Sequence, residues 1–209
     1  MNFCDVFGLD IELLGMVPRP VLAVILLFPI EKDESGRVKN HQASAFAGSE
    51  DHGVSSSDAG VFYIKQKIGN ACGTIALLHA IANNADLISL QENSFLSNLV
   101  NDCREKTPDE RADYLDEKAD FGLESAHNAA AVEENDKISE EEMKTDLHFV
   151  CYVEKGGLLW ELDGRNPLGT IALSKCNKEE LLEKSAEAIQ KRMQSSSSIR
   201  FNIMACTLN

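Results

Sequence analysis

Cys72 has the surroundings that a nucleophilic cysteine needs. It lies between Ala71 and Gly73, at the predicted start of a helix that ends near Asn83 and Asn84. Free backbone N–H groups and the helix dipole at such an end favour the thiolate, and small neighbours leave room for a substrate. The alternative is a buried, unreactive thiol, which is the commonest state of a free cysteine. Position alone leaves both interpretations open.

A reactive cysteine needs a base, and the five histidines differ in their surroundings. His79 is two helical turns from Cys72, about 10 Å along the axis, so we interpret it as a packed or capping side chain. His148 lies in a predicted strand, where a hairpin gives it a neighbour. The remaining histidines lie in polar, loop-like stretches and are interpreted as surface residues: His41, His52 and His127.

Residues 147–165 predict a β-hairpin with Gly156–Gly157 as its turn. In this register residue 148 faces 165 and residue 150 faces 163, so His148 and Asp163 form a diagonal pair on one face. An aspartate in this place would orient the imidazole and stabilise its charged form. A turn of one or three residues would put the two side chains on opposite faces, so the pairing depends on the turn.

Gln66, six residues before Cys72, has an amide donor. The donor could bind an oxyanion beside the Cys72 N–H. The alternative is a polar residue on an edge strand. No metal or cofactor site is predicted, because the six cysteines are widely spaced without a CxxC pair.

The order of predicted elements indicates one α+β domain over residues 1–209 with a mostly antiparallel sheet. Residues 31–60 are expected to form a polar loop, and the acidic stretch 125–146 a solvated linker or helix. Besides the hairpin and the helix at Cys72, the expected elements are a short helix over 9–16 capped by Asp10, a buried strand over 21–28, a strand over 60–66, helices over 91–104, from 107 and over 178–194 (capped by Asn177), and a strand over 199–208.

Charge and composition exclude several classes of partner. The net charge of -14 argues against nucleic acid and against anionic membrane surfaces. The apolar run 21–30 is shorter than the roughly 20 residues that span a bilayer. It is not expected to belong to a signal peptide, because no basic segment precedes it and no cleavage-type stretch follows it. The cysteine usage favours a reduced, cytoplasmic protein.

Several motifs together resemble the ubiquitin C-terminal hydrolase family of cysteine deubiquitinases. They are "QKIGNACGTIALLHAIANN", "DLHFVCYV" and "ELDGR", with "DVFGLD" and "MVPRPVLAVILLFP" near the start and "RFNIMA" near the end. The resemblance covers nearly the whole chain and is weakest in residues 31–60 and 85–145. It implies that Cys72 is the nucleophile, His148 the base and acid, Asp163 its orienter and Gln66 the oxyanion donor.

The resemblance also implies a papain-like fold with a knotted chain, and a substrate. The substrate is ubiquitin, cleaved at an amide, ester or thioester bond of its C-terminal glycine, with other ubiquitin-like proteins as alternative partners. Residues 125–145 then match a crossover loop that passes over the active site and favours small leaving groups. Asp5 and Leu147 match ubiquitin-contacting positions; the alternatives are a strand-end acid and a core leucine. A monomer is expected.

The sequence departs from the family pattern at its start. Members carry a short strand and a helix before the segment that corresponds to "DVFGLD", and here that segment begins at Asp5. Weaker ubiquitin affinity and stability are therefore expected. This keeps open a second function, a ubiquitin-binding protein with little turnover that sequesters free ubiquitin. A papain-like protease with another substrate is a third, weaker alternative.

Overall fold

The computed structural model describes residues 1–30, 56, 59–119 and 147–208. Most of the expected polar loop 31–60 and all of the expected crossover loop 125–145 lie outside these residues. The chain path between the described parts runs through those segments, so the knot stays a prediction. None of the helices in the described part is long and apolar enough to cross a membrane.

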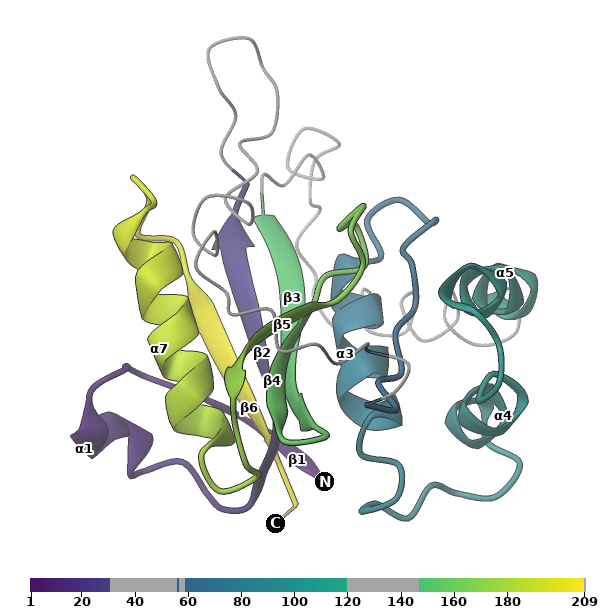
Figure 1. Cartoon of the computed structure of the whole chain (residues 1–209), viewed down its shortest axis with the longest axis horizontal. Coiled ribbons are helices and arrows are strands. Elements are labelled where there is room, and N and C mark those ends of the chain that lie inside the picture. Colours follow the sequence, from purple (N-terminus) through teal and green to yellow (C-terminus); the bar gives the residue numbers. More distant parts are fainter. Residues whose placement is uncertain (31–55, 57–58, 120–146, 209) are drawn as a thin grey trace, which may run out of the picture.

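A six-stranded sheet runs through the centre of the molecule in the order β1-β6-β2-β3-β4-β5 (Figure 1). Every neighbouring pair in it is antiparallel, which confirms the expected sheet type. Its strands are β1 (Asn2–Asp5), β2 (Val21–Pro29), β3 (Leu147–Lys155), β4 (Leu158–Leu162), β5 (Ile171–Lys175) and β6 (Asn202–Thr207).

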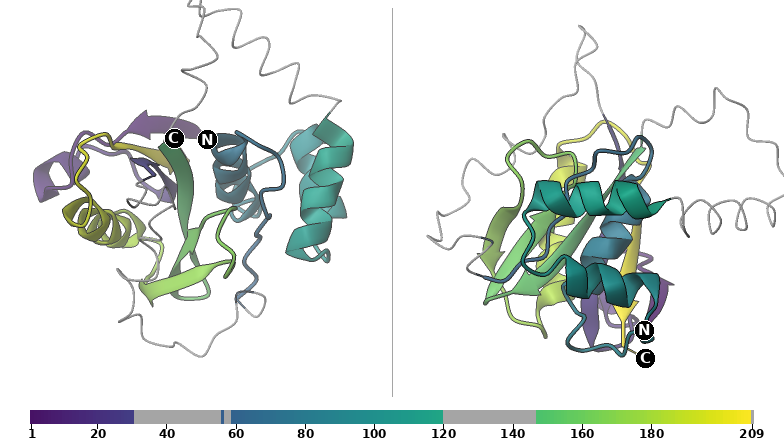
Figure 2. Two further views of the ribbon diagram at one scale, coloured as in Figure 1. Left: turned by 90° about the horizontal axis from the view of Figure 1, so that it is seen from above. Right: turned by 90° about the vertical axis from the view of Figure 1, so that its right-hand side faces the viewer.

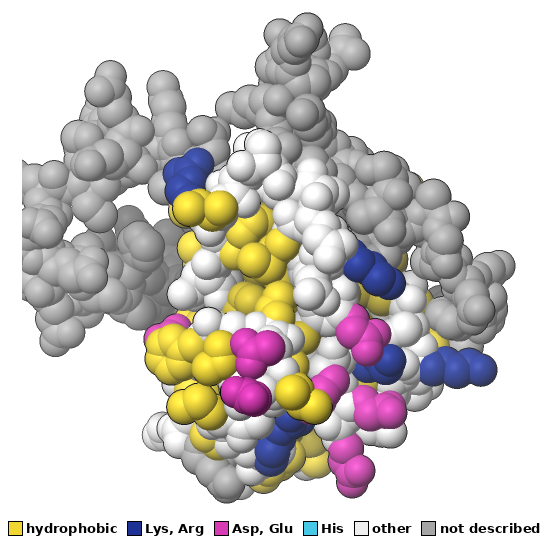
Figure 3. Space-filling model, turned by 90° about the vertical axis from the view of Figure 1, so that its left-hand side faces the viewer, with side chains coloured by type: hydrophobic (Ala, Val, Ile, Leu, Met, Phe, Trp, Pro, Cys, Tyr) yellow, Lys and Arg dark blue, Asp and Glu magenta, His cyan; other side chains and the backbone are white. Residues whose placement is uncertain are grey.

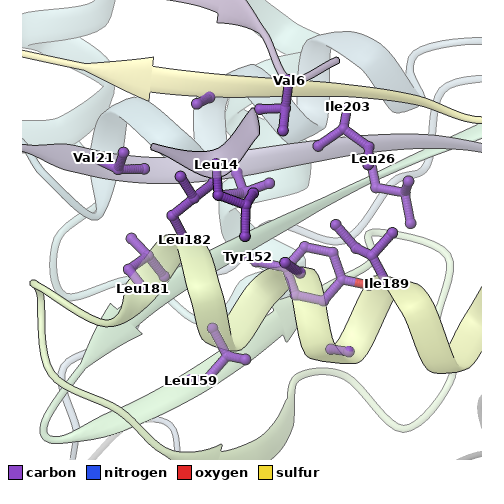
Figure 4. Close-up of a cluster of buried hydrophobic side chains, with 14 of the residues drawn as sticks. Val6, Leu14, Val21, Leu26, Tyr152, Leu159, Leu181, Leu182, Ile189 and Ile203 are labelled. Carbon is purple, nitrogen blue, oxygen red and sulfur yellow. The ribbon is translucent and has the colours of Figure 1, made fainter. Parts of the chain in front are cut away.

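Helices cover both faces of the sheet, as expected for this α+β class (Figures 1 and 2). One face carries α1 (Ile11–Leu14) and α7 (Leu181–Gln194), and the other carries α3 (Cys72–Ala82). Beyond α3 lie α4 (Phe95–Asp102) and α5 (Pro108–Ala119). Three hydrophobic clusters separate these layers: one between α7 and the sheet (Figure 4), one between α3 and the sheet, and one between α3 and the outer helices.

The buried strand predicted at 21–28 is β2, and it lies between β6 and β3. Of its nine residues only Leu27 is not fully buried. A strand with helices against both faces needs apolar side chains in both directions, which explains the continuous apolar run.

The hairpin has the predicted register. Lys155 pairs with Leu158 and Cys151 with Leu162 across β3 and β4. Both turn residues are in the left-handed region, with φ of 63° at Gly156 and 79° at Gly157. Two successive positive φ angles define the tight turn that suits the twist of a hairpin, and glycine adopts them without strain.

The strand predicted over 60–66 is wrong. Its residues are extended and residues 61–64 are buried, but they belong to no sheet. Side chains satisfy its backbone instead of a neighbouring strand: Asn83 bonds both the N–H and the C=O of Phe62, and His79 accepts from the N–H of Ile64. Its β-rich composition therefore reflects burial rather than pairing.

The helix ends differ in detail from the prediction. Asp10 accepts from Leu13 N at 3.0 Å, as expected for the cap of α1. Asn177 accepts from Glu179 N and Glu180 N, but it caps a turn that precedes the helix, and α7 begins at Leu181. The helix expected over 91–104 is the shorter α4.

Candidate active site

His148 and Asp163 meet in a close, buried contact. His148 Nε2 lies 2.7 Å from Asp163 Oδ1, and the residues are 4% and 5% exposed. The contact follows from the hairpin register. His148 in β3 and Asp163, directly after β4, project from the same face of the hairpin. Asp163 Oδ1 also accepts from Arg165 N at 2.8 Å, which fixes the carboxylate in its turn.

Cys72 opens α3, and the local backbone leaves the start of this helix uncapped by a side chain. The N-cap residue is Ala71, which has no side-chain acceptor for the first-turn N–H groups. Asn70 precedes it with a φ of 54°, a left-handed conformation that asparagine tolerates. This turn directs the chain into the helix and leaves N–H groups free to bind a developing negative charge.

The environment of the Cys72 thiol favours its ionised form. Burial raises the pKa of the thiol, but the nearby His148 ring and the backbone of Phe149, together with the His148 charge, outweigh burial and hold the pKa below its usual value. Burial also lowers the pKa of His148, and the contacts with Asp163 and Cys72 reverse this and raise it to about 9. The two shifts together favour a thiolate–imidazolium pair at neutral pH.

The two imidazole nitrogens of His148 have different neighbours. Nε2 is taken by Asp163, whereas Nδ1 is buried and forms no close hydrogen bond within the described part of the chain. Nδ1 is therefore the nitrogen that is left to exchange a proton with Cys72.

A backbone hydrogen bond holds Gln66 next to the candidate active site. Its N–H donates to Gly164 O at 2.8 Å, next to Asp163. Its side-chain Nε2 donates to Ile68 O at 2.9 Å, which uses one of two amide hydrogens and leaves one for another acceptor.

Gly164 is a site residue that the sequence analysis missed. A Cβ there would lie 2.8 Å from Ile75 Cγ2 and 3.0 Å from Gln66 Cβ. Only a glycine lets the segment after β4 approach both α3 and Gln66 this closely. A glycine directly after the candidate aspartate was the feature of the sequence that could have predicted this close approach.

A buried ion pair behind His148 was also missed. Arg192 Nη2 of α7 lies 2.7 Å from Glu161 Oε2 of β4, and the two side chains are 4% and 0% exposed. The Arg192 guanidinium stacks on the ring of Phe28 at 4.5 Å, and the same ring meets the His148 ring edge to face at 5.7 Å. No local sequence pattern links residues on a strand and a helix that far apart.

The other candidate residues lie as follows. Asp5 is exposed at the end of β1, which β6 and β2 separate from β3, and Leu147 is half-buried beside His148. His79 is fully buried and packed, as interpreted from the sequence. His41, His52 and His127 lie outside the described residues. The described residues contain no cluster of side chains that could hold a metal ion.

Comparison with known proteins assigns the chain to a family. Residues 1–194 match the sequence model of ubiquitin carboxyl-terminal hydrolase, family 1. The chain belongs to this family. Ubiquitin carboxyl-terminal hydrolases of family 1 are cysteine peptidases, so the expected enzyme class is confirmed.

Individual relatives support the same assignment. A probable ubiquitin carboxyl-terminal hydrolase of Dictyostelium discoideum is 38% identical over 205 residues, which are 97% of this chain and 77% of the relative. Ubiquitin carboxyl-terminal hydrolase isozyme L1 of Homo sapiens is 36% identical over 166 residues, which are 79% of this chain and 69% of that protein.

A solved structure supports the fold. The catalytic domain of Trichinella spiralis UCH37, bound to ubiquitin vinyl methyl ester, superposes with a TM-score of 0.67 at 18% identity. The match covers 98% of this chain and 83% of that domain.

Proposed function

We propose that this chain is a thiol-dependent deubiquitinase that hydrolyses bonds at the C-terminal glycine of ubiquitin. The observation that carries the proposal is the buried contact of 2.7 Å between His148 and Asp163, next to a cysteine whose pKa is lowered. The names of the relatives, and the ubiquitin derivative bound to the similar Trichinella domain, support the choice of substrate.

The roles follow from the chemistry of these groups. The Cys72 thiolate attacks the glycine carbonyl, and the charge that develops on the carbonyl oxygen is stabilised by the Cys72 N–H and the free amide hydrogen of Gln66. His148, as imidazolium, protonates the leaving group, which leaves a thioester on Cys72. His148 then takes a proton from water, which cleaves the thioester and releases ubiquitin. Asp163 holds the imidazole in orientation throughout.

The charge and surface of the chain suit a ubiquitin partner. A net charge of -14 attracts a basic partner, and the C-terminal tail of ubiquitin is basic. Asp5 lines a groove of about 810 Å³ together with apolar residues such as Met193 and Phe201. Hydrophobic and acidic side chains lie side by side on the face that carries α1 and α7 (Figure 3), and Phe7 and Ile11 are strongly exposed. We assign Asp5 to ubiquitin contact on this basis and on the family resemblance, and Leu147 on the family resemblance alone.

The finer preference for small leaving groups is part of the proposal. It rests on the family resemblance of residues 125–145, which lie outside the described residues. A comparison of ubiquitin carrying a fluorogenic amine with ubiquitin joined to a folded protein would test it, and faster cleavage of the small adduct is expected.

The central experiment measures release of a fluorogenic amine from the C-terminus of ubiquitin. Cys72→Ala should abolish turnover, and Cys4→Ala, at the other half-buried cysteine, should preserve it. Turnover that persists in Cys72→Ala would overturn the proposal. A folded wild-type chain that binds ubiquitin without processing it would instead be a ubiquitin-sequestering protein.

A further inference from the structure

Helix α3 carries two buried polar side chains on the same face as Cys72. His79 and Asn83 are 0% and 3% exposed. They follow Cys72 by seven and eleven residues, so at 100° per residue each projects within about 20° of the direction of Cys72. One stripe of this helix therefore holds the candidate nucleophile at its first residue and two hydrogen-bonding groups near its other end.

These two groups bind the backbone of the extended segment 62–66. Asn83 accepts from Phe62 N at 2.8 Å and donates to Phe62 O at 2.8 Å. His79 Nε2 accepts from Ile64 N at 2.9 Å. Because this segment belongs to no sheet, the side chains take the place of a neighbouring strand, and removing one leaves buried backbone groups unpaired.

His79 is in the protonation state that this contact requires. Burial lowers the pKa of its imidazole to about 4, so the ring is neutral and Nε2 can accept a hydrogen bond. The ring also stacks on Tyr63 at 5.2 Å with an angle of 19° between the planes. The segment is thus held by packing as well as by hydrogen bonds.

The segment that is held in this way places two parts of the candidate active site. Tyr63 OH donates to Asp163 O at 2.8 Å, and Gln66 N donates to Gly164 O at 2.8 Å. A closed circuit of contacts results, from Cys72 along α3 to His79, through residues 62–66 to Asp163, and back through His148 to Cys72.

We propose that His79 and Asn83 are positioning residues. They hold segment 62–66 so that the Gln66 amide lies where it can stabilise the oxyanion formed at Cys72. This inference rests on the proposed function, in which Gln66 stabilises the oxyanion. Helix α3 thus carries Cys72 at its first residue and, through His79 and Asn83 near its other end, determines the position of Gln66. Loss of the hydrogen bonds from His79 and Asn83 should lower kcat and leave KM nearly unchanged, because both side chains are buried and do not contact the substrate themselves.

A double-mutant cycle on kcat with ubiquitin fluorogenic substrate tests the proposal. Gln66→Ala alone should lower kcat by about 10²-fold, which is the usual effect of losing one oxyanion donor. In the His79→Leu background the same substitution should lower kcat by less than about tenfold, because a displaced amide has little left to contribute. His79→Gln, whose amide oxygen can accept from Ile64 N, should restore most of the activity.

Two neighbouring asparagines provide a matched control. Asn83 binds Phe62, whereas Asn84 donates to Leu22 O in β2 and to Ala80 O, away from the segment. Asn83→Leu should reduce the effect of Gln66→Ala, and Asn84→Leu, an equally buried change, should not. If His79→Leu fails to fold, His79→Asn, whose shorter amide cannot reach Ile64 N, takes its place.

The outcomes separate this inference from the proposed function. An equal effect of Gln66→Ala in the wild-type and His79 backgrounds would overturn the positioning role and leave the deubiquitinase proposal intact. No effect of Gln66→Ala in the wild type would remove the oxyanion role and the positioning role together, while loss of turnover in Cys72→Ala would still identify the nucleophile.

Discussion

Replacement of Arg192 by methionine should lower the free energy of unfolding by about 3–5 kcal/mol, because it strands the Glu161 carboxylate in the core. Glu161 is completely buried, and its carboxylate also accepts a hydrogen bond from the hydroxyl of Tyr152 at 2.9 Å. Glu161→Gln should have a similar effect, since it leaves the Arg192 guanidinium without its countercharge. For a domain of ordinary stability, about 5–15 kcal/mol in total, either loss is large.

The double variant separates the pair from a general loss of packing. Arg192→Met with Glu161→Gln removes both charges and puts an apolar side chain against the Phe28 ring in place of the guanidinium, so its stability should lie within about 2 kcal/mol of the wild type. The sum of the two single losses would then exceed the loss in the double variant by several kcal/mol.

Urea unfolding followed by tryptophan fluorescence provides the assay. Trp160, the single tryptophan, is 2% exposed and adjoins Glu161 in β4, so its emission reports directly on this part of the core. Arg19→Met is the matched control. Arg19 pairs with Glu183, a partly exposed residue of the helix that also carries Arg192, and exposed ion pairs contribute about 1 kcal/mol or less. Additive losses in the double variant, or single losses as small as that of Arg19→Met, would refute the reasoning.

Three further predictions concern the site. The folded chain keeps His79 neutral down to pH about 4, whereas the unfolded chain protonates it near 6.5. The free energy of unfolding should therefore fall by about 3 kcal/mol as the pH drops from 6.5 to 4, which the midpoints of urea unfolding would measure. His79→Gln should reduce this dependence of stability on pH. Alkylation of Cys72 by iodoacetamide should proceed well below the ordinary thiol pKa, and His148→Asn should slow it by more than about tenfold at pH 6, whereas equal rates would deny the ion pair. Gly164→Ala should cost about 1–3 kcal/mol and reduce turnover, because its Cβ would lie 2.8 Å from an isoleucine methyl, while Gly69→Ala, in open space, should be neutral in thermal unfolding.

Local signals were sufficient for some parts of this protein. The two glycines of the hairpin turn fixed which residues of β3 and β4 face each other, and this register brings His148 to Asp163. The cap at Asp10 and the apolar run of β2 were equally readable, because each depends on neighbours in the sequence.

Other parts depend on partners that are distant in the sequence. The segment at 60–66 has the composition of a strand, yet side chains at α3 form hydrogen bonds with its backbone groups. No pattern within the segment predicts these partners. The edge strands β1 and β5 are short and largely not buried, so they lack a clear alternation. The pair of Arg192 and Glu161 joins a helix to a strand across the core, which only the folded chain brings together.

The place of β6 in the sheet determines when the fold can be completed during synthesis. β6 lies between β1 and β2, and within the described residues β1 pairs with β6 alone. Translation delivers the N-terminal strands first, so β1 and one edge of β2 stay without a neighbour until residues 202–207 have left the ribosome. A nascent chain that stalls before this point already contains β2, β3 and β4 with the candidate site, but it also presents unpaired backbone at which chains associate. Among the described strands, the one made last is the one that joins β1 to the rest of the sheet.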